Sequence, residues 1–212
     1  MNVAIVYHMF PHYRLAVMRA LDQSGRHEYT LFGDPNEFDG VKPVRADNFR
    51  RFVASPFYVV GGVYWQGASI RVALSRQFDA IIYLANPNFL STWIGALIAR
   101  LTGKRVLFWT HGWLKPESRL KSWIRNAFYR LAHKVLVYGE RAKTLGVSSG
   151  FPADRIAVIY NSLDEEVAAR VFSSLEHGES EFDPRGLFAV PTRPLLICTA
   201  RLPSLCRFDL LL

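Results

Sequence analysis

Apolar runs of strand length recur along the first three quarters of the chain, and stretches with helical periodicity separate most of them. The runs are Asn2–Tyr7, His27–Phe32, Phe57–Val60, Ala80–Ala85, Lys104–Trp109, Lys134–Tyr138 and Arg155–Tyr160. Continuous apolar runs, without polar alternation, are typical of strands that are buried on both faces of a parallel sheet. The alternation of such strands with helices predicts an α/β fold with a doubly wound, Rossmann-like, mostly parallel sheet.

The stretch from Phe78 to Trp113 is the clearest unit of this pattern, because it reads as strand, loop, helix and strand. We expect Asn88 to cap the helix and Thr102-Gly103 to end it. Two strands joined in this way should be parallel, with a right-handed crossover. The helix has the three- and four-residue spacing of an apolar face at Leu90, Ile94, Leu97, Ile98 and Leu101.

Candidate ligand-binding residues follow the two strands of this unit. Asn86 and Asn88 come after the first strand, and His111 and Gly112 come after the second. Open α/β sheets bind ligands beyond the carboxyl ends of their strands. His111 offers a hydrogen-bond donor and an acceptor, and Gly112 removes a side chain where a ligand would approach the backbone. A histidine in this place is also often a purely structural hydrogen-bonding residue, so both interpretations stay open.

Two further helices carry basic residues. A helix predicted from His12 to Gln23 has Arg14 in its first turn, where a cation is unfavourable unless an anion offsets the helix dipole. His12 and Arg14 are therefore a candidate anion or acceptor site, and a solvated surface arginine is the alternative. A helix predicted near Ser118–His133 is amphipathic and basic. Its apolar stripe would pack on the sheet or lie on an anionic membrane, and the two are compatible.

The charge balance changes the range of expected partners. The chain has 26 Lys and Arg against 18 Asp and Glu, a net charge of +8. This excess favours anionic partners such as nucleotide sugars, phospholipid headgroups or nucleic acid. Nucleic acid is the least favoured, because the basic residues are spread along the chain and no helix-turn-helix, RRM or zinc pattern is present.

The absence of several sequence motifs limits the reactions and the cellular locations that we expect for this protein. Neither GxGxxG nor GxxxxGK[ST] occurs, so we expect no nicotinamide, flavin or P-loop chemistry, and no cofactor. The two cysteines, Cys198 and Cys206, make neither a disulfide framework nor a zinc site. The first residues lack a signal peptide, and no apolar run reaches membrane-spanning length. We expect a cytoplasmic protein, with peripheral attachment to the inner membrane face as an alternative.

The character of the sequence changes near its carboxyl end. We expect a helix from Asp164 to Leu175, then a polar, turn-rich stretch, and a new apolar strand at Leu195–Ala200. These features predict an amino-terminal domain at 1–161, a connector at 162–193, and the first strand and helix start of a truncated second domain at 194–212.

The order of the elements and the amino-acid sequences at their ends resemble those of the retaining nucleotide-sugar glycosyltransferases of GT-B fold, the family often called glycosyl transferases group 1. The resemblance is carried by four passages: FPHYRLAVMRAL, FDAIIYLANP with KRVLFWTHGW, VLVYGERAKTLGVSSGFPADRIAVIYNSLD, and ICTARLPSLCRFDLLL. It implies two Rossmann-like domains that face a cleft, the first holding mostly the acceptor and the second mostly the nucleotide sugar.

The resemblance also implies roles for individual residues. His111 matches the family's catalytic-site histidine near the donor sugar, with Gly112 beside it, and Arg201 matches the arginine that binds the donor diphosphate. Arg207 lies one place after the family's lysine position, which is Cys206 here. His12, Arg14, Asn86 and Asn88 are candidates for binding a glycan or lipid-linked acceptor. Transfer would retain configuration, without a covalent nucleophile or a required metal.

Three functional interpretations follow. The leading one is a fragment of such an enzyme that would be inactive alone. The second is a non-catalytic half-enzyme that binds a glycan or a membrane, or one chain of a split glycosyltransferase. The third, a nucleic-acid-binding protein, rests on charge alone.

Overall fold

The computed structural model describes residues 1–161 and 164–176. The chain divides into two compact units, Met1–Glu165 and Glu166–Leu212. Helix α6 (Glu165–Glu176) corresponds to the helix expected from Asp164 to Leu175. The predicted strand at 195–200, the candidate site residues Arg201 and Arg207, and both cysteines lie outside the described residues, so the predicted division into three segments stays a prediction.

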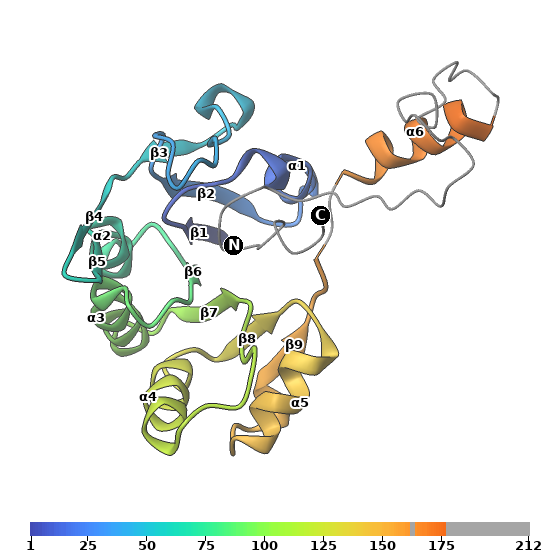
Figure 1. The fold of residues 1–212 in the computed structure, drawn as a ribbon. Coiled ribbons are helices and arrows are strands. Elements are labelled where there is room, and N and C mark those ends of the chain that lie inside the picture. The colour runs from blue at the N-terminus through green and yellow to red at the C-terminus, as the bar shows by residue number, and fades with distance from the viewer. Residues whose placement is uncertain (162–163, 177–212) are drawn as a thin grey trace, which may run out of the picture. The chain divides into compact units, whose positions relative to one another are not determined.

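The first unit is built on a seven-stranded parallel sheet with the strand order β3-β2-β1-β6-β7-β8-β9 (Figure 1). The strands are β1 (Asn2–Val6), β2 (Glu28–Gly33), β3 (Phe52–Ala54), β6 (Ala80–Leu84), β7 (Arg105–Thr110), β8 (Lys134–Val137) and β9 (Ile156–Val158). The chain builds outward from β1 in one direction to β3, and then returns to the other side of β1 at β6. The predicted doubly wound parallel sheet is confirmed.

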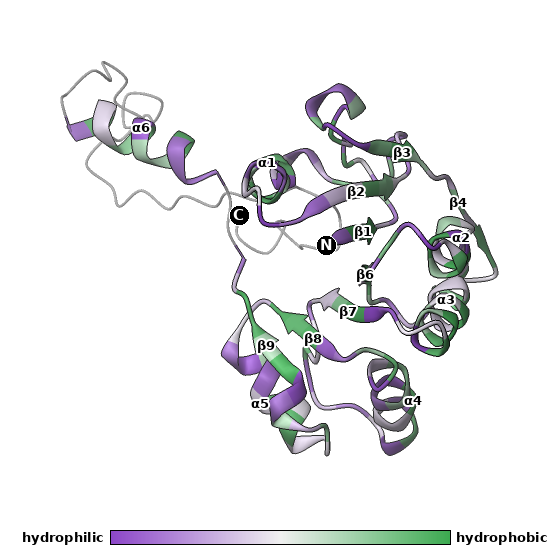
Figure 2. Cartoon of the chain, turned by 180° about the vertical axis from the view of Figure 1, so that it is seen from behind, coloured by the Kyte–Doolittle hydropathy of each residue, from purple (hydrophilic) through white to green (hydrophobic). Residues whose placement is uncertain are grey.

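Helices cover both faces of the sheet, and the direction of strand addition decides which face each helix takes. Right-handed crossovers that run in opposite directions lie on opposite faces. One core lies beneath α1 (Leu15–Gln23), where Met18 packs with Ile5 and Leu31. The other core holds residues of α2 (Ala68–Leu74), α3 (Leu90–Leu101), α4 (Arg119–Tyr129) and α5 (Glu140–Ser148). Figure 2 shows the hydrophobic colouring of the strands between these helices.

One of the predicted strands exists but does not belong to the parallel sheet. Phe57–Val60 is a strand, β4, but it pairs antiparallel with β5 (Val63–Gln66) in a separate two-stranded ribbon. Gly61 and Gly62 form the connecting turn, with φ of 58° and 80°. The sheet edge is instead β3, in a segment where the sequence predicts no strand, and its Phe52 pairs with Leu31. Three residues are too few to show a hydrophobic period, so β3 forms because β2 offers it an edge.

Helix boundaries also differ at their first turns. The predicted helix from His12 opens as a 3-10 turn at His12–Arg14, and the α-helix begins at Leu15. The helix α3 is capped by Phe89 rather than Asn88, without a side-chain hydrogen bond. Asn88 instead donates its backbone N–H to the Asn86 Oδ1 at 3.0 Å, which closes a turn before the helix.

Candidate functional site

A cavity of about 670 Å³ opens at the carboxyl ends of β1, β6 and β7. The strand order reverses between β1 and β6, and open α/β sheets bind ligands at such a switch point. Residues that follow the three strands form its wall together with the first half of α4, namely Tyr7, His8, Asn86, Asn88, Thr110, His111, Gly112, Leu114, Glu117, Lys121, Ile124 and Arg125. Four predicted site residues, His111, Gly112, Asn86 and Asn88, are therefore brought together.

His111 lies directly after β7, at the rim of the cavity. Its ring is 4.8 Å from the ring of Tyr138, in an edge-on arrangement. Much of the residue is exposed, but partial burial of the ring lowers the pKa of His111, and the nearby positive charge of Arg14 lowers it further. The imidazole is therefore neutral at pH 7 and presents one donor and one acceptor nitrogen to the cavity.

Arg14 lies behind this histidine rather than in the cavity wall. Its side chain is buried, with the residue only 8% exposed. The guanidinium carbon is 4.8 Å from the Tyr138 ring centroid and 5.5 Å from that of Trp109. The alternative of a solvated surface arginine is wrong, because the two rings hold the cation inside the protein. Arg14 acts on the cavity through Tyr138 and His111, and direct contact with an acceptor stays a prediction.

Gly112 serves packing more than ligand approach. Its φ of 72° favours glycine, and a Cβ there would lie 2.8 Å from the Val137 Cγ1. The space that the missing side chain leaves is thus filled by β8. Its backbone N–H donates to the Thr110 Oγ1 at 3.1 Å. The glycine allows the chain to turn sharply against the sheet, which aims His111 outward.

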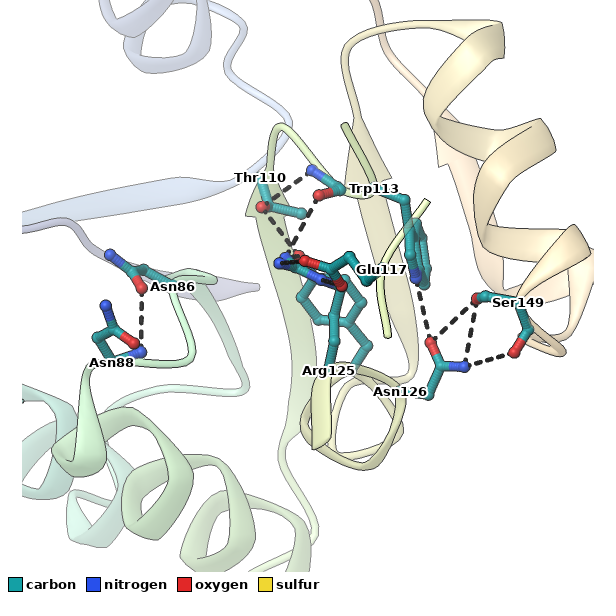
Figure 3. Close-up of polar contacts among 10 residues, drawn as sticks. Asn86, Asn88, Thr110, Trp113, Glu117, Arg125, Asn126 and Ser149 are labelled. Atoms are coloured by element: carbon teal, nitrogen blue, oxygen red, sulfur yellow. Dashed lines mark hydrogen bonds and ion pairs between the residues drawn. The ribbon is translucent and has the colours of Figure 1, made fainter. Parts of the chain in front are cut away.

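A polar network fixes the loop between β7 and α4 (Figure 3). Arg125 donates to Glu117 through its Nε and Nη2, both at 2.7 Å, and also contacts the Tyr129 hydroxyl at 3.3 Å. Tyr129 in turn lies 3.3 Å from the Thr110 Oγ1. The Arg125 hydrogen bonds hold the pKa of Glu117 below its ordinary value. The charge of Arg125 is paired with Glu117, so this arginine of the predicted basic helix positions the loop.

A second contact anchors the same loop to α5. The Trp113 Nε1 donates to the Asn126 Oδ1 at 3.1 Å, and the Asn126 amide donates to the Ser149 carbonyl at 2.8 Å (Figure 3). Trp113 is buried against Gly146, where a Cβ would lie 2.6 Å from its ring. The loop that carries His111 is therefore tied down on both sides.

The remaining acceptor candidates differ in position. Asn86 and Asn88 line the cavity, with the Asn86 Oδ1 engaged in the turn and the Asn88 side chain exposed. His12 does not line the cavity; its Nδ1 lies 3.3 Å from the Lys42 carbonyl at the protein surface. The structure therefore separates His12 from the other candidates.

Sequence reasoning missed His8, which lines the cavity directly after β1. Its ring is surrounded by aromatic side chains, with centroid distances of 5.1 Å to Tyr7, 5.7 Å to Phe57 and 6.1 Å to Phe38. Burial lowers the pKa of His8 to about 4, although the negative charge of Asp34 opposes the shift. The sequence feature that could have identified His8 is its position directly after a buried strand, which is also the feature that identified His111.

Within residues 1–161 and 164–176, no group of three or more His, Cys, Asp or Glu side chains is placed to hold a metal ion. The helices in that part of the chain are also too short or too polar to cross a bilayer.

Solved structures with a similar fold share little sequence with this chain. The lipopolysaccharide outer core galactosyltransferase WaaB, in its apo form, is 16% identical with a TM-score of 0.50, covering 77% of this chain and 46% of that chain. Anabaena Alr3699/HepE in complex with UDP-glucose is 14% identical with a TM-score of 0.56, and the match covers 85% of this chain and 50% of that chain. UDP-GlcNAc 2-epimerase from Neisseria meningitidis, bound to UDP-GlcNAc, is 12% identical with a TM-score of 0.54, and the match covers 84% of this chain and 51% of that chain.

These likenesses establish the fold, and the chain spans about half of the length of each of these structures. Among proteins of curated function, none matches this sequence. A family model does match: Glycosyltransferase Family 4, over residues 13–167, which is well over half of the chain. That span contains both strands of the central unit, His111 and the loop anchored by Glu117 and Trp113. The chain belongs to Glycosyltransferase Family 4.

Proposed function

We propose that this chain supplies the acceptor side of a glycosyltransferase that moves a sugar from a nucleotide-sugar donor to a glycan or a lipid-linked acceptor, with retention of configuration. The observation that carries the proposal is the cavity at the switch point between β1 and β6, with the neutral ring of His111 on its rim. The family match supports sugar transfer, since the fold alone is shared with an epimerase.

His111 is the residue that we place nearest to the reacting sugar. Its neutral imidazole donates or accepts a hydrogen bond without adding a charge that a developing oxocarbenium ion would oppose. Because the loop is held by Glu117 and Trp113, the backbone that carries the ring is fixed before the substrate arrives.

A nucleotide sugar is the proposed donor. Two of the structural neighbours are described with UDP-glucose or UDP-GlcNAc bound. The net charge of +8 suits a diphosphate ligand. Because this chain spans about half of each neighbour, we propose that the donor diphosphate is bound by residues such as Arg201 and Arg207 together with further protein, from a longer chain or a separate one.

The acceptor is proposed to enter between the loop after β6 and the first half of α4. Asn86 and Asn88 offer amide groups for sugar hydroxyls on one wall, and Lys121 offers a cation on the other. Leu114 and Ile124 are apolar and also line this side. Such a mixture fits an acceptor with a sugar and an attached apolar or phosphate-bearing carrier.

The proposal is tested with the 212-residue chain, assayed alone and co-expressed with the donor-binding domain of a GT-B enzyme. Transfer of radiolabelled sugar to lipid-linked and free glycan acceptors is measured, together with acceptor binding by isothermal titration calorimetry. We expect acceptor binding in both preparations and transfer only in the second. Transfer by the chain alone would contradict the half-enzyme proposal, and the lack of both binding and transfer would overturn the function.

His111→Ala is the decisive variant. We expect it to lower transfer by about a hundredfold, because one preorganised hydrogen bond at the reacting sugar is lost. His27→Ala is the matched control, since His27 is an exposed histidine next to the start of β2, at the opposite end of the sheet. Because the pKa of His111 is lowered, transfer should be constant above about pH 6.5 and fall in acid as the ring gains a proton.

A further inference from the structure

Helix α3 turns its large aliphatic side chains away from the protein. Of the apolar face predicted from the sequence, Ile98 is partly buried and packs on the core. The other four residues, Leu90, Ile94, Leu97 and Leu101, are exposed, with Leu101 at 79%. The buried residues of the helix are small, namely Ser91, Thr92, Gly95, Ala96 and Ala99. A helix that is apolar all round is normally covered on every side, and Figure 2 shows α3 coloured mainly as hydrophobic. We therefore expect another molecule to cover the outer face of α3.

The small inward residues explain why the large ones face out. A Cβ on Gly95 would lie 2.3 Å from the Ser69 carbonyl oxygen, so α2 and α3 approach each other too closely for any side chain at this position. The core beneath α3 is filled by aromatic side chains such as Tyr83 and Phe108. The orientation of the stripe is thus imposed by packing.

The β4–β5 ribbon extends this apolar surface at the first turn of α3. The Tyr64 ring stacks on Phe89 at 4.9 Å, and the Tyr64 N–H donates to the Asn88 carbonyl at 2.9 Å. The exposed apolar side chains of the ribbon are Tyr58, Val59, Val60, Val63 and Trp65, with Val60 at 78%. No charged residue occurs between Arg51 and Arg71, so the whole ribbon is uncharged.

The first half of α4 adds a third part. Leu120 and Trp123 are exposed, with Trp123 at 66%, whereas Phe128 further along the helix is buried. The Trp93 ring of α3 packs on Phe128 at 4.8 Å, so the two helices are neighbours on the same face of the sheet. Both helices begin at the carboxyl ends of strands, which places their first turns beside the mouth of the cavity.

The exposed charges around this surface are mainly positive, since Glu117 before α4 is partly buried and paired with Arg125. Between residues 48 and 116 the only acidic residue is Asp79, and its carboxylate accepts the Asn2 N–H at 2.8 Å. Exposed cations lie on α3 at Arg100 and on α4 at Arg119 and Lys121, and two more lie nearby in the chain, Arg71 on α2 and Lys115 before α4. In a symmetric dimer the same patch meets itself, so these cations would face one another without acidic partners. A second copy of the chain is therefore disfavoured.

We infer that the outer faces of α3 and the β4–β5 ribbon, with the first half of α4, dock on an anionic lipid bilayer. Leucine and tryptophan side chains enter the headgroup region while lysine and arginine contact the phosphates, as in interfacial helices. The surface brings the cavity mouth to the membrane, so its biological role rests on the proposed lipid-linked acceptor. Docking itself requires no sugar transfer.

The test is sedimentation of the full 212-residue chain with vesicles, in the absence of any sugar donor. We expect binding to phosphatidylglycerol vesicles about tenfold stronger than to phosphatidylcholine vesicles. The double variant Leu97→Gln/Leu101→Gln should weaken binding by about tenfold, and Leu120→Gln/Trp123→Gln should act in the same direction. Because these side chains are exposed, circular dichroism and thermal melting should stay unchanged.

The matched control is Val171→Gln/Leu175→Gln on α6, a pair with the same four-residue spacing and similar exposure on a helix that carries three glutamates. It should leave vesicle binding unchanged. Equal binding by the α3 double variant and the wild type would overturn the inference. So would a dimer in analytical ultracentrifugation that the α3 variant dissociates. Vesicle binding by a chain that neither binds acceptor nor supports transfer when co-expressed with the donor-binding domain would overturn the proposed function and leave the docking surface standing.

Discussion

The His8 ring is enclosed by Tyr7, Phe38 and Phe57 at the wall of the cavity, and its Nδ1 is buried without a hydrogen-bond partner among the described residues. A charged imidazole loses its hydration in such a place, so the neutral form is favoured. His8 and His111 follow two different strands of one sheet. Each is kept neutral by its surroundings, His8 by burial and His111 by burial and Arg14.

Acid should therefore destabilise the protein through His8. The pKa is about 4 in the folded state and 6.5 in the unfolded state, so the unfolded state binds a proton as the pH falls below 6.5. The stabilisation is complete above pH 6.5, and about 2 kcal/mol should be lost by pH 5. Urea unfolding at pH 7 and pH 5 measures this, and His8→Phe should remove that share of the pH dependence. An unchanged pH dependence in His8→Phe would contradict the assignment.

At the scale of elements, the loop from β7 to α4 depends on one ion pair. Glu117→Gln leaves the Arg125 guanidinium partly buried without its carboxylate, and we expect a loss of about 1–3 kcal/mol in unfolding free energy. Hydrogen exchange should also become faster in the segment 111–118. Asp47→Asn is the control, because the Arg45–Asp47 pair is exposed and should change stability by less than about 0.5 kcal/mol. Equal effects of the two variants would refute the positioning role of Glu117.

The contact between α2 and α3 gives a second prediction at this scale. Gly95→Ala places a methyl group against the Ser69 backbone, and we expect a loss of about 1–3 kcal/mol in the free energy of unfolding, measured by thermal or urea unfolding. Gly67→Ala is its counterpart: nothing lies within 4 Å of its Cβ and its φ is −61°, so the change should be small. If Gly95→Ala were as stable as the wild type, the close helix approach that turns the leucines outward would be wrong.

At the scale of the whole molecule, the net charge of +8 attracts any polyanion, and apolar surface decides which one binds best. We expect weaker binding to random duplex DNA than to phosphatidylglycerol vesicles at about 150 mM salt, and a steeper loss of DNA binding as salt rises. Fluorescence anisotropy and vesicle sedimentation at matched phosphate concentration compare the two. Stronger binding of DNA would favour the nucleic-acid alternative that charge alone leaves open.

The amino-acid sequence by itself determined six of the seven parallel strands, the crossover helix before β7 and the place of His111, because buried strands and helix periodicity are local patterns. It did not decide which side of a helix faces the core. The sequence predicted which residues of α3 and α4 are apolar and share a face. In α3, however, the tight contact at Gly95 and the aromatic core leave no room beneath the helix, so its large residues face outward. Only tertiary packing paired β3 with β2, buried Arg14 between two rings and joined Arg125 to Glu117. These contacts depend on how the elements pack in three dimensions, and no local pattern encodes them.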